Sequence, residues 1–266
     1  MKKIIYLIVI AFISLPLSAY SQQIPESINT NQISIGIKDS LYAEILAEQR
    51  EIWIHVPKTK LKDQKFPVLF LLDAEWNFDA VVGVMKSYVL NDQCPEMVIV
   101  AIPNTNRYRD LSTSHIGDET NPSGGAENFI KFIEHELIPF IDKKYPTTSY
   151  RTFIGHSLGG LVVINTLMKH PHLFNNYLAI DPSLGWDNQK LLNEVRPIVK
   201  ESEFENKSLY IGVANTLRDG MDYEKALKDT TSATLHLRSI VEFSKLAKSN
   251  INLLAEWKYY ENESHG

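Results

Sequence analysis

The stretch that decides the fold reads RTFIGHSLGGLVVI and spans residues 151–164. It joins a short apolar run to the motif Gly-X-Ser-X-Gly at residues 155–159, and helically spaced apolar residues follow. A strand, a sharp turn and a helix are the context in which this motif predicts an exposed, activated serine. Glycines beside the serine give the strained turn its room. Ser157 is therefore the candidate nucleophile, and the alternative is a glycine-rich turn with a surface serine.

The composition fits one domain with a substantial core, because 44% of the 266 residues are hydrophobic. The net charge is −5 and the basic residues are scattered, so the chain lacks the basic surface that nucleic acid requires. Cys94 is the single cysteine, which excludes an intrachain disulfide and a cysteine-rich metal site. We expect no nucleic-acid partner, no metal and no cofactor.

Residues 1–21 have the pattern of a secretory signal peptide: two lysines, an apolar run over residues 4–15 and a small-residue end. The run is shorter than the roughly 20 residues that a membrane-spanning helix needs. The alternative is an uncleaved N-terminal anchor. We expect cleavage before Gln22, a mature domain over residues 22–266 without a stable membrane anchor, and a periplasmic or secreted location.

Apolar patterns along the chain predict strands and helices in alternation. This order predicts a single α/β domain of the α/β-hydrolase type, with a mostly parallel sheet covered by helices on both faces. The predicted strands, besides the one that leads into the serine motif, cover residues 33–37, 52–56, 66–72, 97–102, 177–180, 208–213 and 253–260, with 41–46 as a further candidate. Helices are predicted over residues 78–90, 126–145 and 233–247, after the serine motif, and after Asp187, and a long loop covers residues 103–125.

A serine needs a base before it can act as a nucleophile. In this fold the order along the chain is serine, then acid, then histidine. His236 falls within a predicted helix and is interpreted as a packing or surface residue, whereas His265 follows the last strand in a loop that can reach Ser157. We predict His265 as the base. His156, adjacent to the serine, is expected to point away from it as a structural histidine.

The acid that orients the histidine should follow the strand over residues 208–213. Asp219, Asp222 and Glu224 all lie within range, and their spacing does not decide among them. We choose Asp219. A Ser–His pair without an acid stays open as an alternative.

Two backbone N–H groups are expected to stabilise the oxyanion that forms on the substrate. Leu158, at the start of the helix that follows the serine, supplies the first. The second should come from the turn after the strand over residues 66–72, from Ala74 or Glu75. We choose Glu75, with its side chain incidental.

Several further motifs accompany the serine motif, and together they carry a family resemblance. They are Leu71-Leu72-Asp73-Ala74, Asn106-Arg107-Tyr108-Arg109-Asp110, Glu136-Leu137-Ile138-Pro139-Phe140-Ile141, Asp181-Pro182-Ser183-Leu184 with Trp186, and Glu263-Ser264-His265-Gly266. With them, the chain from Pro67 onward resembles the putative-esterase branch of the α/β-hydrolases, which includes esterase D-like, ferri-siderophore, feruloyl and acetyl-xylan esterases. The resemblance implies Ser157 as nucleophile and His265 as base.

The loop over residues 103–125 follows the carboxyl end of a strand, where open α/β sheets bind ligands. The resemblance implies that Arg107 and Arg109 lie near the mouth of the site. With Trp186 they are predicted to bind an anionic or aromatic substrate group. The alternative is that Arg109 pairs with a neighbouring acid such as Asp110 and pins the loop.

The sequence also departs from the family. Relatives usually have Gly at the position of Ala74, Ser at that of Asp181 and Trp at that of Gly185. The last change widens the pocket if Gly185 lines it. Relatives continue past the His-Gly with a further helix, so we expect the C-terminal helix to be missing and the chain to be truncated or impaired.

The implied function is that of an exported serine esterase that hydrolyses carboxylic esters through an acyl-enzyme. Siderophore-type lactones and carbohydrate-linked acyl esters both remain open, so the expected partner is a small-molecule or glycan-linked ester. The alternative is an impaired member of the same fold that binds a ligand or glycan in the same cleft. The sequence does not predict the oligomeric state.

Overall fold

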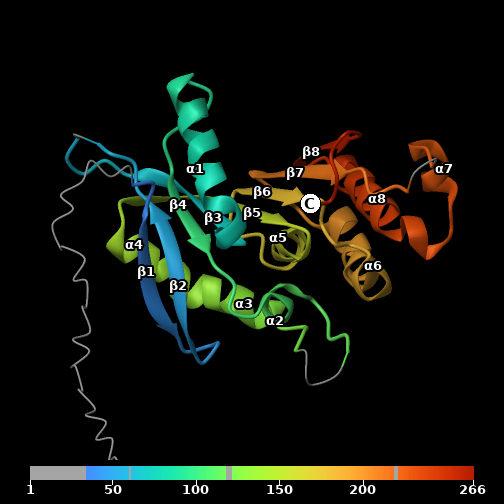
Figure 1. Cartoon of the computed structure of the whole chain (residues 1–266), viewed down its shortest axis with the longest axis horizontal. Helices are drawn as coiled ribbons and strands as arrows, with labels where there is room; N and C mark the ends of the chain where they lie inside the picture. The colour runs from blue at the N-terminus through green and yellow to red at the C-terminus, as the bar shows by residue number, and fades with distance from the viewer. Residues whose placement is uncertain (1–33, 60, 118–121, 219–220) are drawn as a thin grey trace, which may run out of the picture. The chain divides into compact units, whose positions relative to one another are not determined.

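The computed structural model describes residues 34–59, 61–117, 122–218 and 221–266 (Figure 1). The predicted signal peptide lies outside these residues. None of the helices in the described ranges combines the length and the apolar character of a membrane span. The strands are β1 (Ile37–Ala43), β2 (Glu48–His55), β3 (Phe66–Leu72), β4 (Val98–Ile102), β5 (Thr147–His156), β6 (Asn176–Ile180), β7 (Lys207–Ala214) and β8 (Leu253–Tyr260). The helices are α1 (Ala74–Leu90), α2 (Arg107–Leu111), α3 (Ala126–Phe132), α4 (Ile138–Lys144), α5 (Leu158–Lys169), α6 (Trp186–Glu201), α7 (Tyr223–Lys228) and α8 (Leu235–Ser249), with a π-helical turn η1 (Ile133–Leu137) and a 3₁₀ turn η2 (Ser232–Thr234).

The strands form one eight-stranded sheet in the order β1-β2-β4-β3-β5-β6-β7-β8. From β4 to β8 all neighbouring strands are parallel, while β2 pairs antiparallel with both β1 and β4. The prediction of a single α/β domain with a mostly parallel sheet is confirmed. Because parallel strands end at one edge, the residues that follow β3, β5, β6 and β7 are brought together there.

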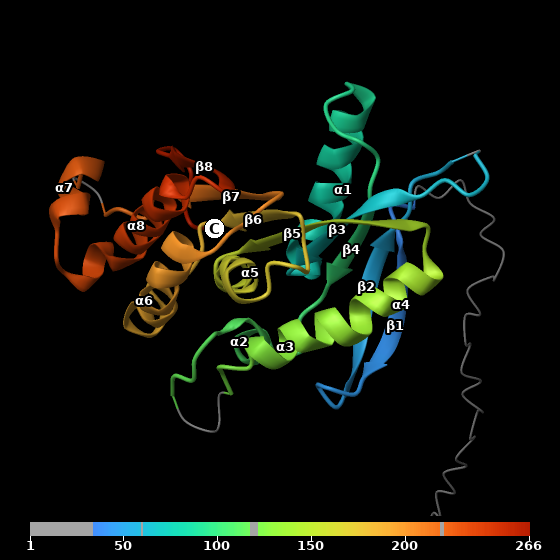
Figure 2. The ribbon, with the colours of Figure 1, turned by 180° about the vertical axis from the view of Figure 1, so that it is seen from behind.

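The larger core lies on the face of the sheet that carries α3, α4, α5, α6 and α8 (Figure 2). Its centre is aromatic. The rings of Phe153 and Phe174 stack with centroids 4.6 Å apart, and Phe70 meets Phe174 edge-on at 5.6 Å. All three side chains are buried. This core fixes β3 and β5, the two strands that lead into the candidate site.

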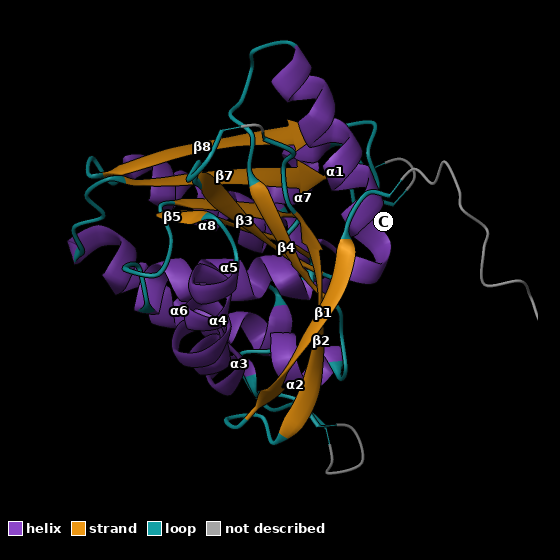
Figure 3. Cartoon of the chain, turned by 90° about the vertical axis from the view of Figure 1, so that its left-hand side faces the viewer, coloured by secondary structure: helices purple, strands orange, loops and turns teal. Residues whose placement is uncertain are grey.

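On the opposite face, α1 packs over β3 and β4 through Phe78 and Val82 (Figure 3). Over β6 to β8 the same face is open in the described part of the chain: Ile180 is 37% exposed and Leu254 is 71% exposed. A pocket of about 370 Å³, lined by Tyr210, Tyr260 and neighbouring residues, lies there. The expectation that helices cover both faces therefore holds at β3 and β4 but not at β6 to β8.

The long helix predicted over residues 126–145 is interrupted. It consists of α3, the π-helical turn η1 and α4 in direct succession. Pro139, at the start of α4, has no N–H, and its ring crowds the carbonyl of His135 four residues earlier. The wider turn relieves this conflict while the apolar stripe stays on the core.

The first two strands also differ from the prediction. In the structure β1 and β2 form an antiparallel hairpin, in which β2 begins four residues before the strand predicted over residues 52–56. β1 overlaps the end of the strand predicted over residues 33–37 and the start of the candidate over residues 41–46. Both β1 and β2 are rich in polar residues, because an edge hairpin exposes much of its surface and keeps only some positions in the core. The apolar pattern therefore marks only part of each strand.

Candidate active site

Ser157 lies between β5 and α5, with backbone angles φ 59° and ψ −117°. Such a conformation is strained for a residue with a side chain, and it places the serine at the tip of the turn. A Cβ atom at Gly155 would lie 2.4 Å from the carbonyl carbon of Gly159, so the turn closes only with glycine there. The Ser157 N–H donates to the carbonyl of Ile180, which ties the turn to the end of β6. The structure thus has the strand, turn and helix that the motif predicts.

A chain of hydrogen bonds links Ser157 to His265 and Asp181. His265 Nε2 lies 3.0 Å from Ser157 Oγ, and His265 Nδ1 lies 2.5 Å from Asp181 Oδ2. A carboxylate can only accept, so Nδ1 carries the proton and Nε2 presents its lone pair to the serine hydroxyl. This is the arrangement in which an imidazole can take the proton of a serine.

Asp181 follows β6 in a left-handed conformation with φ 42°, and its side chain is buried. Oδ1 accepts the N–H of Ala214, and Oδ2 accepts hydrogen bonds from both His236 and His265. Burial alone would raise the pKa of the Asp181 carboxyl. The hydrogen bonds from the two imidazoles and the N–H outweigh burial and hold the pKa well below its usual value. The group is therefore ionised.

The acid beside His265 is thus Asp181, from the end of β6, and not a residue that follows β7. The predicted acid Asp219 lies outside the described residues. Asp222 caps α7, where it accepts the N–H of Lys225 at 2.8 Å, and Glu224 is exposed. The signal for Asp181 in the sequence was its place directly after a predicted buried strand.

Hydrogen bonds to the end of β7 hold the segment that carries His265. The Asn215 N–H donates to the carbonyl of Glu263 at 2.7 Å, and its side-chain amide donates to the carbonyl of Glu261 at 2.9 Å. The hydroxyls of Tyr210 and Tyr260 lie 2.5 Å apart at the base of this segment. The structure therefore places the predicted base against Ser157.

Two further histidines lie beside the site. The ring of His156, which was predicted to point away from Ser157 as a structural histidine, packs against that of His265, with centroids 4.9 Å apart. Burial and the nearby His265 lower the pKa of His156. His236 lies in the first turn of α8, not in mid-helix, and its Nε2 lies 3.0 Å from Asp181 Oδ2.

Asp181, His236 and His265 also form the one group in the described ranges whose spacing would allow a metal ion, since their ligand atoms lie within 4.8 Å of one another. The hydrogen bonds among the three side chains already use these atoms. The cluster therefore reads as a hydrogen-bond network around one carboxylate.

Ser183 is a further neighbour of the candidate nucleophile that the sequence interpretation left without a role. Its hydroxyl lies 3.1 Å from Ser157 Oγ, and its N–H donates to the Ser157 carbonyl at 3.0 Å. These two contacts hold the turn after β6 against the serine turn.

The two predicted oxyanion donors lie at neighbouring helix starts. Leu158 opens α5, and Glu75 is the second residue of α1. N–H groups in a first helical turn have no partner within the helix. A Cβ atom at Gly159 would lie 3.4 Å from Asp73 Oδ2, so the two helix starts approach closely.

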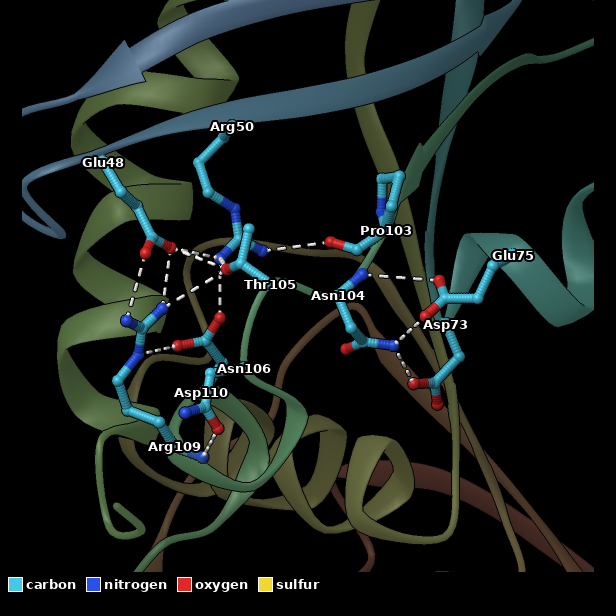
Figure 4. Close-up of polar contacts among 10 residues, drawn as sticks. All are labelled: Glu48, Arg50, Asp73, Glu75, Pro103, Asn104, Thr105, Asn106, Arg109 and Asp110. Atoms are coloured by element: carbon cyan, nitrogen blue, oxygen red, sulfur yellow. Dashed lines mark hydrogen bonds and ion pairs between the residues drawn. The ribbon is translucent and has the colours of Figure 1, made fainter. Parts of the chain in front are cut away.

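The sequence suggested that the side chain of Glu75 is incidental, but in the structure this side chain forms hydrogen bonds. Its Oε1 accepts from the Asn104 side-chain amide at 2.7 Å, and its Oε2 accepts the Asn104 N–H at 3.3 Å (Figure 4). The same amide of Asn104 donates to Asp73 Oδ1 at 2.7 Å. Glu75 therefore anchors the start of the loop after β4 to α1.

Arg107 is paired with a buried carboxylate. Its guanidinium donates to Asp73 Oδ1 at 2.7 Å and to Oδ2 at 3.0 Å, and also to the carbonyl of His156 at 3.3 Å. The side chain of Asp73 is 1% exposed. An unpaired buried carboxylate lowers the stability of a fold, so the main role of Arg107 in this structure is to compensate the charge of Asp73.

Arg109 is likewise held by acids. It donates to Asp110 at 2.6 Å and to Glu48 at 2.7 and 3.1 Å (Figure 4). The hydrogen bond from Arg109 opposes the effect of burial and lowers the pKa of Glu48 to about 2. These contacts correspond to the structural alternative, in which Arg109 pins the loop.

Trp186 lines an open pocket of about 490 Å³. Its indole N–H donates to the carbonyl of Ser114 at 3.3 Å, and its ring lies 6.3 Å from that of Tyr108. The pocket reaches the site through His236, and Gly185 lines it as well. The residues that line this pocket are Ile116, Gly185, Trp186, Asp187, Asn188, Ser232, Leu235 and His236.

Known proteins that are similar to this chain include several esterases. The model of the family described as "Putative esterase" matches residues 43–236. The ferri-bacillibactin esterase of Bacillus subtilis is 32% identical over 187 residues, which cover 61% of this chain and 63% of that protein. The siderophore enterobactin esterase of Emericella nidulans is 32% identical over 124 residues, 46% of this chain and 37% of that protein. The chain thus spans less than two thirds of the length of either curated relative.

Among solved structures, an IroE-like serine hydrolase from Shewanella oneidensis is 31% identical. The superposition covers 86% of this chain and 75% of that one, with a TM-score of 0.77.

Proposed function

The chain belongs to the putative-esterase family, and from this premise we propose that it hydrolyses carboxylic esters through an acyl-enzyme. Ser157 is the nucleophile, His265 the base and Asp181 the acid that orients the base. The observation that carries the proposal is the unbroken hydrogen-bond chain from Ser157 Oγ through His265 to Asp181.

In acylation, Ser157 Oγ attacks the ester carbonyl carbon while its proton passes to His265 Nε2. The imidazolium that forms keeps its Nδ1–H bonded to the Asp181 carboxylate. When the tetrahedral intermediate collapses, the bond to the alcohol oxygen breaks and His265 Nε2 returns the proton to that oxygen. The acyl group remains on Ser157 as an ester.

In deacylation, a water molecule takes the place of the alcohol. His265 Nε2 accepts one of its protons, the hydroxide attacks the acyl carbon, and the proton returns to Ser157 Oγ as the acid leaves. In both steps the N–H groups of Leu158 and Glu75 face the oxygen on which negative charge develops. Preorganised donors of this kind supply a large part of such catalysis.

A siderophore-type ester with an aromatic acyl or alcohol part is the substrate class we favour. The names of the relatives point to siderophore esters. The pocket beside the site offers the ring of Trp186 for an aromatic group, and the ring of Tyr108 lies 6.3 Å from that of Trp186. Carbohydrate-linked acyl esters are the second class. Hydrolysis rates on a catecholate lactone, a feruloyl ester and an acetylated oligosaccharide would rank the classes.

Ser157→Ala is the direct test of the proposed function. We expect kcat/KM for p-nitrophenyl acetate to fall by about 10⁴-fold or more, because no other group on this turn can form the acyl-enzyme. The melting temperature should stay near that of the wild type, because only a hydroxyl at a half-exposed turn is removed. Full turnover in the variant would refute the serine mechanism. Binding without turnover in the wild type would favour the ligand- or glycan-binding alternative.

Export is part of the proposal and rests on the sequence of residues 1–21 alone. Cell fractionation, together with the mass of the mature N-terminus, tests it. We expect the protein outside the cytoplasm with Gln22 as its first residue. A cytoplasmic protein that begins at Met1 would contradict export without affecting the proposed chemistry.

A further inference from the structure

Asp181 accepts a hydrogen bond that the proposed proton transfer does not use. Its Oδ2 lies 2.5 Å from His265 Nδ1 and 3.0 Å from His236 Nε2, while Oδ1 accepts the N–H of Ala214 at 2.9 Å. His265 takes part in the reaction and Ala214 anchors the far oxygen. His236 is thus a second imidazole on the oxygen that orients the base.

His236 lies between the substrate pocket and this buried carboxylate. It is the second residue of α8, it lines the pocket of about 490 Å³, and its side chain is 28% exposed. The side chain of Asp181 is 1% exposed. The rings of His236 and His265 are perpendicular, with centroids 5.0 Å apart. The two imidazoles therefore approach the same oxygen from different elements, α8 and the C-terminal segment.

A buried carboxylate needs donors from several directions to hold one orientation. The Ala214 N–H fixes Oδ1 from the end of β7, but His265 must itself be oriented and cannot serve as the fixed reference. His236, on the first turn of a 15-residue helix that packs on β7 and β8, is a fixed donor for Oδ2. Without His236, the Oδ2 atom of Asp181 would be bonded only to His265, the residue that Asp181 has to position.

We propose that His236 is a positioning residue, whose Nε2–H holds Asp181 Oδ2 in line with Nδ1 of His265. The inference rests on the proposed function, because it assigns His236 a part in the same reaction. His236 acts through Asp181 and makes no contact with the reacting atoms. Its loss should therefore lower kcat more than it raises KM.

Two variants test this role in the full protein. His236→Leu removes the donor, and kcat should fall by about tenfold to a hundredfold, the usual value of a hydrogen bond to a charged group. His236→Gln keeps an N–H near the position of Nε2 and should retain most of kcat. His135→Gln makes the same kind of change at an exposed histidine of η1 that neither lines the pocket nor bonds to Asp181, and this control should leave kcat unchanged.

The background variant Asp181→Asn makes the test specific. If His236 acts through Asp181, then adding His236→Leu to Asp181→Asn should lower kcat little further, because the carboxylate is already absent. An equal loss in both backgrounds would overturn the proposal. A higher KM with unchanged kcat in His236→Leu would also overturn the proposal, because it would show that His236 only lines the pocket.

A readout without substrate separates this inference from the proposed function. In the NMR spectrum, the Nδ1–H proton of His265, assigned with His265→Gln, should be shifted far downfield by its hydrogen bond to Asp181. It should move upfield or vanish in His236→Leu and persist in His236→Gln. An unchanged resonance in His236→Leu would overturn the positioning role. A wild type without Ser157-dependent turnover would refute the esterase proposal alone.

Discussion

At the residue scale, Asp181 shows how this site keeps a charge inside the protein. A buried ion costs several kcal/mol unless donors compensate for the lost water. Here Ala214, His236 and His265 supply three donors to two oxygens. The same donors lower the pKa of Asp181, so it can stabilise an imidazolium on His265 at any pH where the imidazole can act as a base.

We predict that Asp181→Asn lowers kcat/KM by about 10²- to 10⁴-fold, because the amide cannot hold His265 in the productive tautomer. Asp219→Asn is the matched control and should stay within about threefold of the wild type. Steady-state hydrolysis of p-nitrophenyl acetate measures both. A large loss in Asp219→Asn with little loss in Asp181→Asn would return the role of the acid to the loop after β7.

The sequence predicted the serine and the histidine that lie in contact in the structure, but it chose Asp219 and not Asp181 as the acid, for a physical reason. Ser157 and His265 are marked by a strained-turn motif and by their order along the chain. Asp181 is marked in the sequence only by its place directly after a predicted strand, and its left-handed turn is visible only in the backbone. His236 was missed similarly, because the predicted helix began two residues too early and placed it in mid-helix.

At the element scale, ion pairs fasten the loop after β4 to the sheet. The buried Arg50 of β2 donates to Asp110 of α2 at 2.6 Å and to Glu48 at 2.9 Å. Arg109 bonds to the same two acids (Figure 4). The loop therefore forms part of the rigid frame of the site, which limits the freedom of its arginines to bind substrate.

We expect Arg107→Ala to lower the free energy of unfolding by about 3–5 kcal/mol, because it leaves the buried carboxylate of Asp73 without its charge partner. Arg196→Ala removes a half-exposed pair with Glu242 and should cost no more than about 1 kcal/mol. Denaturant unfolding measures both variants. Equal, small losses would refute the structural role, and a selective loss of activity on anionic esters would restore the substrate-binding prediction.

The interior strands could be predicted from the sequence, whereas the β1–β2 edge could be predicted only in part. β3 over residues 66–72 has the predicted bounds, because its apolar run reflects burial in the sheet. The edge strand β8 also has its predicted bounds, residues 253–260. The β1–β2 hairpin was predicted only in part, and the short helices α2 and α7 were missed. Their stability comes from tertiary contacts such as the Arg50–Asp110 pair, which no local pattern encodes.

At the scale of the whole domain, stability should depend on pH through the half-buried His156 and the buried Asp181. The pKa of His156 is lowered from 6.5, first by burial and then by the charge of His265. Below about pH 6.5 the unfolded chain binds a proton at this residue that the folded protein binds less readily, so stability falls. The pKa of Asp181 is lowered from 3.8, so its contribution is complete above that pH and is lost only under stronger acid.

Between pH 7.5 and pH 5 we therefore predict a fall in melting temperature to which His156 contributes and Asp181 does not. His156→Gln removes a group that titrates, so its melting temperature should fall less over this range than that of the wild type. His135→Gln, at an exposed histidine, is the reference variant. An identical fall in the wild type and His156→Gln would contradict the assignment.

The role of Ser157 as nucleophile can be tested by the mass of the intact protein after reaction with a fluorophosphonate, followed by peptide mapping. Only an activated serine reacts quickly with this reagent. We predict one adduct on the wild type, located on Ser157, no adduct on Ser157→Ala, and a labelling rate reduced at least about tenfold in Asp181→Asn. A wild type that hydrolyses esters but remains unlabelled at Ser157 would contradict the role of Ser157 as the nucleophile.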